Sequence, residues 1–247
     1  MIWEEFRTPP KFGCELPGPK GPGFRRPDES LSHEAMLAPA IGEAVRSLQG
    51  LIAESEKSAR RYLRRFLSHD DMTKTPLRLL NEHTQSLGEL LEPLERGECW
   101  GLISDAGLPC LADPGADLVW QARSRGVTIQ ALPGPSSIVL ALQLSGLSGQ
   151  RFSFHGYLPR EGPDLERKII ELEKRSRAES ASQIFIEAPY RSAKLLDLLV
   201  QTLQPATRLC VAVNLTTPNE RVISQSVEQW KKRKVELGKE PAVFLFQ

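Results

Sequence analysis

Hydrophobic residues recur along this chain with two spacings, one typical of helices that bury a single face and one typical of buried strands. The helical spacing predicts helices over the ranges 35–48, 56–66, 114–125, 136–146, 164–179 and 193–203, and around Trp230. The other apolar runs predict strands over 49–55, 100–103, 127–132, 152–158, 183–187, 208–215, 220–227 and 242–246. Strands that alternate with helices indicate an α/β fold built on a parallel sheet.

Composition and pattern divide the chain into three parts. Residues 1–35 are dominated by Pro, Gly and charge, which is typical of irregular segments because little apolar surface is available for burial. Residues 36–148 predict an N-terminal α/β domain with a parallel sheet. The break at Gly146 and Gly149 marks the expected boundary. Residues 149–247 predict a second α/β domain with a mixed sheet, in which 220–227 pairs antiparallel and the last strand lies inside the sheet.

The 247 residues carry a formal net charge of +1, so no global basic field points to nucleic acid and any polyanion site must be local. The four cysteines are scattered, without a CxxC pair or a zinc-like His spacing: Cys14, Cys99, Cys110 and Cys210. This usage predicts a reduced, cytoplasmic protein without disulfides or a structural metal. The chain has no apolar run of membrane-spanning length and no secretory signal, so we expect no membrane association.

The segment from Leu102 to Gly115 reads LISDAGLPCLADPG, which predicts a strand, a glycine loop and the start of a helix. Asp113 and Pro114 are typical of helix starts, because Asp caps free amides and Pro is tolerated at the first helical position. Ligands of open parallel sheets bind beyond the carboxyl ends of the strands. The segment alone leaves a connecting turn and a ligand-binding loop equally open.

A second strand-to-helix turn, LPGPSS at 132–137, follows one helix and one strand later and falls on the same edge of the predicted sheet. The hydroxyls of Ser136 and Ser137, together with free amides at the helix start, suit a carboxylate, an amine or a ribose. The simpler interpretation is that Ser136 only caps its helix. The pairing of the two turns favours a binding edge.

Polar side chains at the ends of predicted elements are candidates for catalysis. Glu54 closes the strand LIAE, His83 lies in LLNEHT, and Glu187 ends the strand of IFIEAPYR, which leads to Tyr190 and Arg191. Such groups line the ligand crevice of an open parallel sheet. Each is also compatible with a solvated side chain or a surface ion pair of little consequence.

The helix KSARRYLRRF predicts one apolar face and one basic face. The apolar face holds Ala59, Tyr62, Leu63 and Phe66, and the basic face holds Lys57, Arg60, Arg61, Arg64 and Arg65. A basic face near an aromatic residue suits phosphates, although such faces are more often only solvated. The chain has no GxGxxG, Walker, HExxH or GxSxG motif, which argues against dinucleotide oxidoreductases, P-loop NTPases, zincins and α/β-hydrolases.

In this order and at these intervals, SDAGLPCLADPG, LPGPSS, FHGYLP and FIEAPYR resemble the tetrapyrrole methylase family, the class III S-adenosylmethionine-dependent methyltransferases. The segment LIAESEKSARRYL resembles the family's Ala-Glu-Asp-x-Arg segment. The resemblance covers residues 37–247. It is closest to the branch that methylates ribose 2'-hydroxyls of ribosomal RNA, and to a short bacterial subgroup of methyltransferases without an assigned acceptor.

The resemblance implies a two-domain α/β fold, a homodimer, and S-adenosylmethionine bound between the domains. By position, the implied cofactor contacts are Ser104, Asp105, Ala106, Gly107, Leu108, Leu111, Asp113, Ser136, Ser137, Phe185, Ile186, Asn214 and Leu215. The expected substrate contacts are Lys57, Arg61 and Arg191. A ribose acceptor also needs a group that takes its proton, for which Glu54, His83 and Glu187 are the candidates. No metal is implied.

The chain departs from the family pattern on the side where the acceptor is expected. The family's first strand has no counterpart, because LAPAIGE at 37–43 fits the following helix instead. Ser55 and Lys57 stand where the family has Asp and Arg, and Asn214 stands where it has an acid. RNA is the favoured acceptor. The alternatives are a small molecule such as a tetrapyrrole, or a relative that binds the cofactor and acts as a binding protein.

Overall fold

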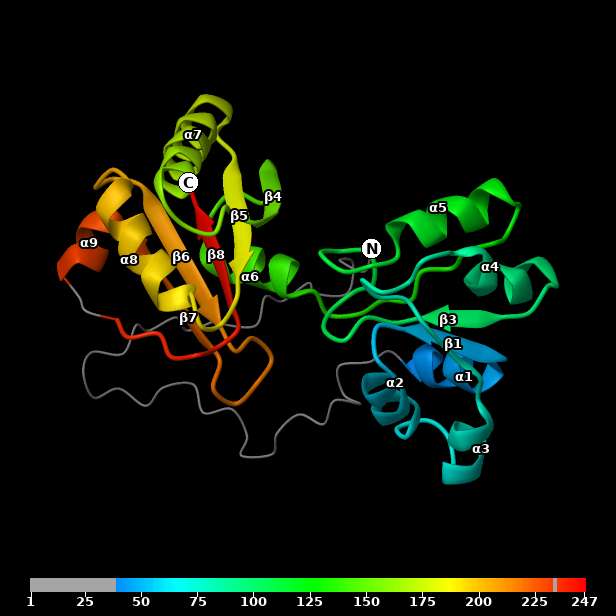
Figure 1. Ribbon diagram of the computed structural model, residues 1–247. Coiled ribbons are helices and arrows are strands. Elements are labelled where there is room, and N and C mark those ends of the chain that lie inside the picture. The colour runs from blue at the N-terminus through cyan, green and yellow to red at the C-terminus, as the bar shows by residue number, and fades with distance from the viewer. Residues whose placement is uncertain (1–38, 233–234) are drawn as a thin grey trace, which may run out of the picture.

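The computed structural model describes residues 39–232 and 235–247. The expected irregular segment at 1–35 lies outside these residues. The described chain forms two α/β units, each built on its own sheet (Figure 1). The first sheet has three parallel strands and the second has five strands in a mixed arrangement, so the predicted fold class is confirmed.

The first sheet has the strand order β2-β1-β3. Its strands are β1 (Gly50–Ala53), β2 (Leu77–Leu79) and β3 (Trp100–Leu102). One face is covered by α1 (Pro39–Ser47), α2 (Glu56–Leu63) and α3 (His69–Lys74), and the other by α4 (Gly88–Glu95) and α5 (Ala116–Ser124). Side chains alternate across β1, since Leu51 and Ala53 pack against α1 and α2 while Ile52 packs against α4 and α5. Both faces are therefore buried, as is usual for a parallel sheet.

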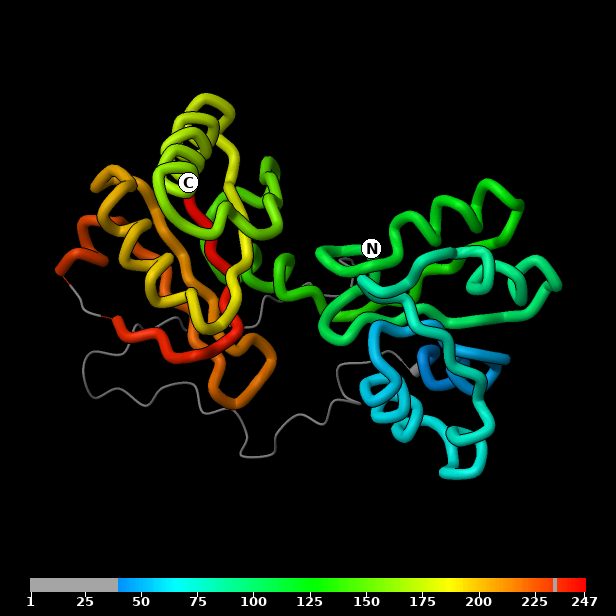
Figure 2. The backbone as a smooth tube through the Cα atoms, viewed as in Figure 1, coloured from blue at the N-terminus to red at the C-terminus, as the bar shows by residue number. Residues whose placement is uncertain are grey.

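The strand expected at 127–132 does not form, and this prediction was wrong. Residues 127–136 run without assigned secondary structure from α5 to the next helix and join the two units (Figure 2). Val127 and Ile129 still pack against the cluster beneath β3, so the apolar alternation is used for burial. A strand also needs a neighbour to accept its hydrogen bonds, and β1 is the only neighbour of β3 in the described sheet.

The second sheet has the order β4-β5-β8-β6-β7. Its strands are β4 (Phe152–Tyr157), β5 (Ser182–Glu187), β6 (Arg208–Val213), β7 (Arg221–Ser226) and β8 (Ala242–Phe246). β4 and β5 are parallel, and the other neighbours are antiparallel. The last strand lies between β5 and β6 and all five of its residues are buried, so the prediction that it lies inside the sheet is confirmed.

Helices cover both faces of the second sheet. One face carries α7 (Pro163–Glu179), α8 (Ser192–Thr202) and α9 (Val227–Lys232), and the other carries α6 (Ser137–Ser145). Phe185 stacks on Phe244 at 5.8 Å within the larger core. Ile138 and Leu142 of α6 pack against the opposite face of the sheet. The helix that precedes the expected boundary at 148 thus packs on the second sheet.

No helix within 39–232 or 235–247 is long and apolar enough to cross a membrane.

Candidate functional site

The carboxyl ends of β1 and β3 are joined by side chains that follow each strand. The backbone N–H of Asp105 donates to Glu54 Oε1 at 3.0 Å. The hydroxyl of Ser55 lies 3.2 Å from both carboxylate oxygens of Asp105 and donates to them. Ser55 also caps α2, because its oxygen accepts from the backbone N–H of Ser58 at 3.3 Å. The predicted candidates Glu54 and Asp105 are therefore brought together at one edge of the sheet.

Asn81, which follows β2, connects that strand to the same edge. Its side-chain amide donates to the backbone carbonyl of Glu54 at 3.2 Å, and its backbone N–H donates to Thr84 Oγ1 at 2.9 Å. Sequence reasoning missed Asn81, although it lies in the NEHT segment just after β2. The position at a strand end, which selected Glu54, is the signal that would have found it.

Asp113 contributes a third carboxylate next to this pair. Partial burial raises the pKa of its carboxyl above the ordinary value of 3.8, and the nearby negative charges of Glu54 and Asp105 act in the same direction. A hydrogen bond with Ser104 has the opposite effect. The expectation that Asp113 caps the following helix was wrong: Gly115 is the N-cap of α5, and no side chain caps that helix start.

The loop between β3 and α5 follows a path that few side chains permit. Gly107, Cys110, Ala112 and Gly115 all have a positive φ, at 85°, 66°, 67° and 131°. A Cβ atom at Gly115 would lie 2.8 Å from Cys110 Sγ, so this part of the loop is closely packed. A Cβ atom at Gly107 would meet nothing within 4 Å. The loop is therefore tight at its base and open at Gly107.

The two glycine loops lie against each other. A Cβ atom placed on Gly134 would be 2.8 Å from Leu108 Cδ2, so the 132–137 turn contacts the loop that follows β3. Ser136 is the N-cap of α6 and is buried, but its hydroxyl makes no capping hydrogen bond. The position of the cap was predicted, and the bond expected from it was wrong. Ser137, the first residue of α6, is exposed.

Glu187 and Arg191 form a buried pair in the second unit. One carboxylate oxygen, Glu187 Oε1, accepts from the backbone N–H of Ala188 at 2.6 Å, from Arg191 Nε at 2.9 Å and from Arg191 Nη2. The side chain of Glu187 is only 2% exposed. A carboxylate that is enclosed and neutralised in this way is poorly placed to take a proton from a substrate. Glu187 is thus a weaker candidate base than Glu54.

The other expected contacts in the second unit have structural partners of their own. Phe185 is fully buried in the core, and its strand is paired with β4 on one side and β8 on the other. Ile186 and Leu215 pack with the cluster on the α6 face. The backbone of Asn214 has a positive φ of 52°, and its side chain donates to Glu240 Oε1 at 2.8 Å. Their roles in cofactor binding stay predictions.

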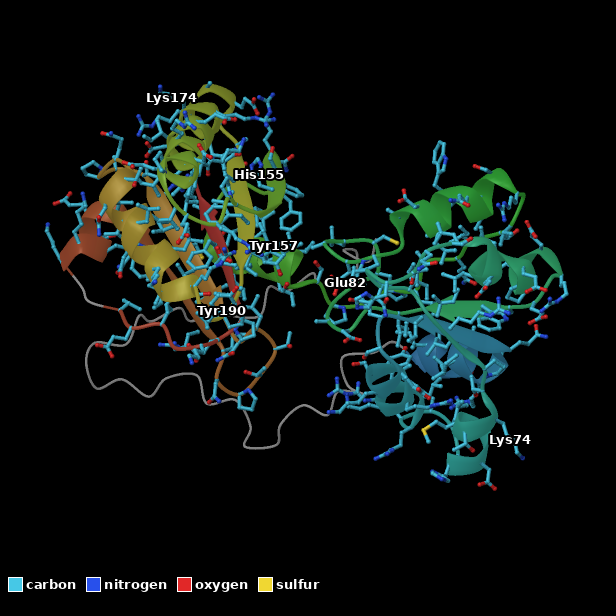
Figure 3. The ribbon with its side chains drawn as sticks, in the orientation of Figure 1. Lys74, Glu82, His155, Tyr157, Lys174 and Tyr190 are labelled. Atoms are coloured by element: carbon cyan, nitrogen blue, oxygen red, sulfur yellow. The ribbon has the colours of Figure 1, made fainter. Side chains whose placement is uncertain are left out.

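His83 lies on the surface and lines an open groove of about 900 Å³ with residues that include Asn81 and Glu89. Its ring nitrogen Nε2 is 3.6 Å from a carboxylate oxygen of Glu82, which Figure 3 labels. The backbone N–H of His83 donates to Asn81 Oδ1 at 3.0 Å. The structure therefore links His83 to the candidate edge through Asn81.

The basic face of α2 is divided in the structure. Arg60 turns toward the protein, donates to the backbone carbonyls of Met72 and Thr75, and pairs with Glu56 at 3.5 Å. Lys57 and Arg61 are exposed and have no ion pair within the described part of the chain. Arg60 thus stabilises the fold, whereas the two expected substrate contacts on α2 are exposed, as are Arg64 and Arg65 of the same basic face.

Comparison with known proteins identifies relatives of this chain. Residues 42–230 match the family model described as Tetrapyrrole (Corrin/Porphyrin) Methylases. The chain is 33% identical over 163 residues to the ribosomal RNA small subunit methyltransferase I of Vibrio cholerae, and the match covers 66% of this chain and 55% of the relative. It is 30% identical over 189 residues to the protein of that name from Bacillus subtilis, which covers 76% of this chain and 61% of the relative. The chain thus matches just over half of these relatives' length.

The fold also resembles that of a solved structure. The crystal structure of the methyltransferase CobJ aligns with a TM-score of 0.57 over 86% of this chain and 88% of that protein. The identity of 17% makes this a likeness of fold alone. The two-unit architecture implied by the sequence motifs is thereby confirmed.

Proposed function

As the chain belongs to the tetrapyrrole methylase family, we propose that it is an S-adenosylmethionine-dependent methyltransferase that acts on RNA. The observation that carries this proposal is the contact between Leu108 and Gly134, which places the 132–137 turn against the loop that follows the carboxyl end of β3. Ligands of open α/β sheets bind at this kind of edge.

The residues at this edge fit S-adenosylmethionine, the methyl donor of the family. Open space at Gly107 leaves the backbone accessible, because a Cβ atom there would meet nothing within 4 Å. The donor carries a positive sulfonium, a positive amine and one carboxylate, so its net charge is positive. Glu54, Asp105 and Asp113 place three carboxyl groups together at the same edge, which complements that charge. When bound, this cofactor supplies a methyl group that is already activated for transfer.

The chain's own residues then have to orient the acceptor and take up its proton. Glu54 is the best-placed candidate, because its carboxylate is oriented by the Asp105 N–H at the strand edge. His83 is the second candidate, since it is exposed and tied to Asn81. A carboxylate held in a fixed position acts on a hydroxyl without the entropic cost of being brought to it.

Two observations support RNA as the acceptor. The relatives from Vibrio cholerae and Bacillus subtilis are both named as ribosomal RNA methyltransferases. The exposed Lys57 and Arg61 of α2 are cations without an ion pair among residues 39–232 and 235–247, as phosphate contacts require. The homodimer implied by the family resemblance stays a prediction, which light scattering of the purified chain checks.

The experiment has two steps. Isothermal titration with S-adenosylmethionine is expected to show binding, and no heat at high micromolar ligand contradicts the proposal. The protein is then incubated with methyl-labelled cofactor and total RNA from a strain that lacks the gene. Label in RNA supports the proposed acceptor, label only in small molecules favours the small-molecule alternative, and binding without any transfer favours a catalytically altered relative.

A further inference from the structure

Two tyrosines are exposed at the same edge of the second sheet. Tyr157 is the last residue of β4, and Tyr190 follows the end of β5. Because these neighbouring strands are parallel, both residues lie at the carboxyl edge (Figure 3). Tyr157 is 60% exposed and Tyr190 is 69% exposed. Neither phenol forms a hydrogen bond within the described residues, so the rings are held out without a structural partner for their hydroxyls.

A β-bulge sets the direction of Tyr157. Phe154 pairs with Ile184, but Tyr157 pairs with Ile186, so three steps along β4 correspond to two along β5. Gly156, at φ 62°, supplies the extra residue. The shift places Tyr157 opposite Ile186, on the sheet face that packs against α6. The N-terminus of α6 belongs to the 132–137 turn, so Tyr157 lies on the face that leads to the candidate site.

A fixed cation accompanies Tyr190. The guanidinium carbon of Arg191 lies 5.9 Å from the centre of the Tyr190 ring, within the range of a cation–π interaction. Glu187 holds this guanidinium through Nε and Nη2. Arg160, exposed just beyond Tyr157, adds a second positive charge at the same edge. The edge thus combines two exposed aromatic rings with two arginines.

We propose that Tyr157 and Tyr190 stack on unpaired bases of a single-stranded RNA segment, and so position the acceptor beside the candidate site. This inference rests on the proposed function. Exposed aromatic rings next to arginine are the usual means of binding unpaired bases, because every base has a π face. A duplex hides those faces, so the edge selects single strands. The phosphates of the segment are contacted by Lys57 and Arg61 of α2.

The test measures binding of a fluorescein-labelled single-stranded RNA, and of the same RNA in a duplex, by fluorescence anisotropy. Y157A and Y190A are each expected to weaken single-strand binding by roughly fivefold to a hundredfold, whereas Y157F and Y190F keep binding because the ring remains. W120A is the matched control, since Trp120 is an exposed aromatic residue on α5, 73% exposed and away from this edge. Its binding is expected to equal that of the unchanged protein.

Salt separates stacking from phosphate contacts. The tyrosine variants are expected to keep the dependence of affinity on salt concentration, because they remove no charge contact. In the double variant K57A and R61A, the slope of log affinity against log salt concentration is expected to become less steep by about 0.7 for each lost phosphate contact. Thermal unfolding of Y157A and Y190A is expected to match the unchanged protein, since exposed side chains contribute little to stability.

Three results overturn the inference. The first is equal RNA affinity of Y157A, Y190A and the unchanged protein, which leaves the proposed function intact. The second is tighter binding of the duplex RNA than of the single-stranded RNA. The third is a change in oligomeric state of the tyrosine variants in sedimentation without loss of RNA binding, which assigns the edge to a second copy. If the unchanged protein binds the cofactor and no RNA, the proposed acceptor itself fails.

Discussion

The backbone N–H of Asp105 donates a hydrogen bond of 3.0 Å to Oε1 of Glu54, and this bond joins the carboxyl ends of two neighbouring parallel strands. The Ser55 hydroxyl returns a bond to the Asp105 carboxylate at 3.2 Å. Each of the two acids is thus held by a group from the opposite strand. The orientation of Glu54 is set by the backbone, which is what a proton acceptor in a methyl transfer to a hydroxyl requires.

Substitution of Glu54 by Gln separates the structural and chemical roles of this side chain. The Gln amide oxygen still accepts from the Asp105 N–H, so the fold is expected to persist. Loss of the proton acceptor is expected to lower the rate of methyl transfer by about 10²- to 10⁴-fold. The rate is measured with labelled cofactor and RNA, and cofactor affinity by titration. Glu43→Gln, exposed on α1, is the control. Full activity of Glu54→Gln removes Glu54 from the reaction.

Gly107 tests whether the open part of the loop holds the cofactor. Gly107→Val is expected to fill space that the backbone leaves free and to abolish measurable cofactor binding. The positive φ of 85° also strains the substituted residue by about 1–2 kcal/mol. Gly97→Val is the matched control, because Gly97 has a φ of 83° and equally open space but lies in another turn. Both variants are compared by titration and by urea unfolding. Equal cofactor affinity of the two places the ligand elsewhere.

Most elements of the fold were predictable, because each depends on a local pattern that the chain itself completes. The buried run at 242–246 predicts an internal strand, and β5 and β6 are present to pair with it. The alternation at 127–132 is as regular, yet no strand forms there. The difference is the partner: backbone pairing depends on a neighbouring strand that the local pattern does not contain. The residues instead pack Val127 and Ile129 against the core, and their backbone lies outside the sheet.

The position of the candidate site was predictable from the sequence, but the hydrogen bonds and ion pairs of its residues were not. A polar residue after a buried strand indicates a functional edge, and this criterion selected Glu54, which the structure brings together with Asp105, a contact implied by the family resemblance. It also selected Glu187, whose charge is neutralised by Arg191 four residues later, a contact that depends on the turn between them. Asp113 does not cap the helix, because the loop has left-handed residues at Cys110 and Ala112 and the helix begins after Gly115. Such loop conformations are set by packing, which sequence spacing does not reveal.

Two neighbouring arginines of α2 are expected to serve different properties, Arg60 the stability of the fold and Arg61 the affinity for RNA. Arg60→Ala removes donors to the carbonyls of Met72 and Thr75, which connect α2 to α3, and is expected to lower the free energy of unfolding by about 1–3 kcal/mol. Arg61→Ala is expected to change it by less than about 0.5 kcal/mol, since Arg61 is exposed. Urea unfolding measures both. RNA affinity is expected to fall only in Arg61→Ala, so a fall confined to Arg60→Ala contradicts the assignment.

Asp113 gives the protein a pH dependence with a defined sign. The pKa of its carboxyl is raised in the folded state, first by burial and then by Glu54 and Asp105. Between the ordinary value of 3.8 and the raised value, the folded protein therefore binds more protons than the unfolded chain. The contribution of this group to stability is full below that window and is lost as the pH rises through it.

Asp113→Asn removes the titration while its amide keeps a partner for Ser104. The variant is expected to gain stability relative to the unchanged protein as the pH rises from 3.8, with a constant difference once Asp113 is fully ionised. Urea unfolding at a series of pH values measures this difference. Asp197→Asn, on the exposed side of α8, corrects for the loss of one negative charge. Parallel curves for Asp113→Asn and the unchanged protein contradict a raised pKa of Asp113 in the folded state. A growing difference confirms that ionised Asp113 is disfavoured in the folded protein, first by its burial and then by the charges of Glu54 and Asp105.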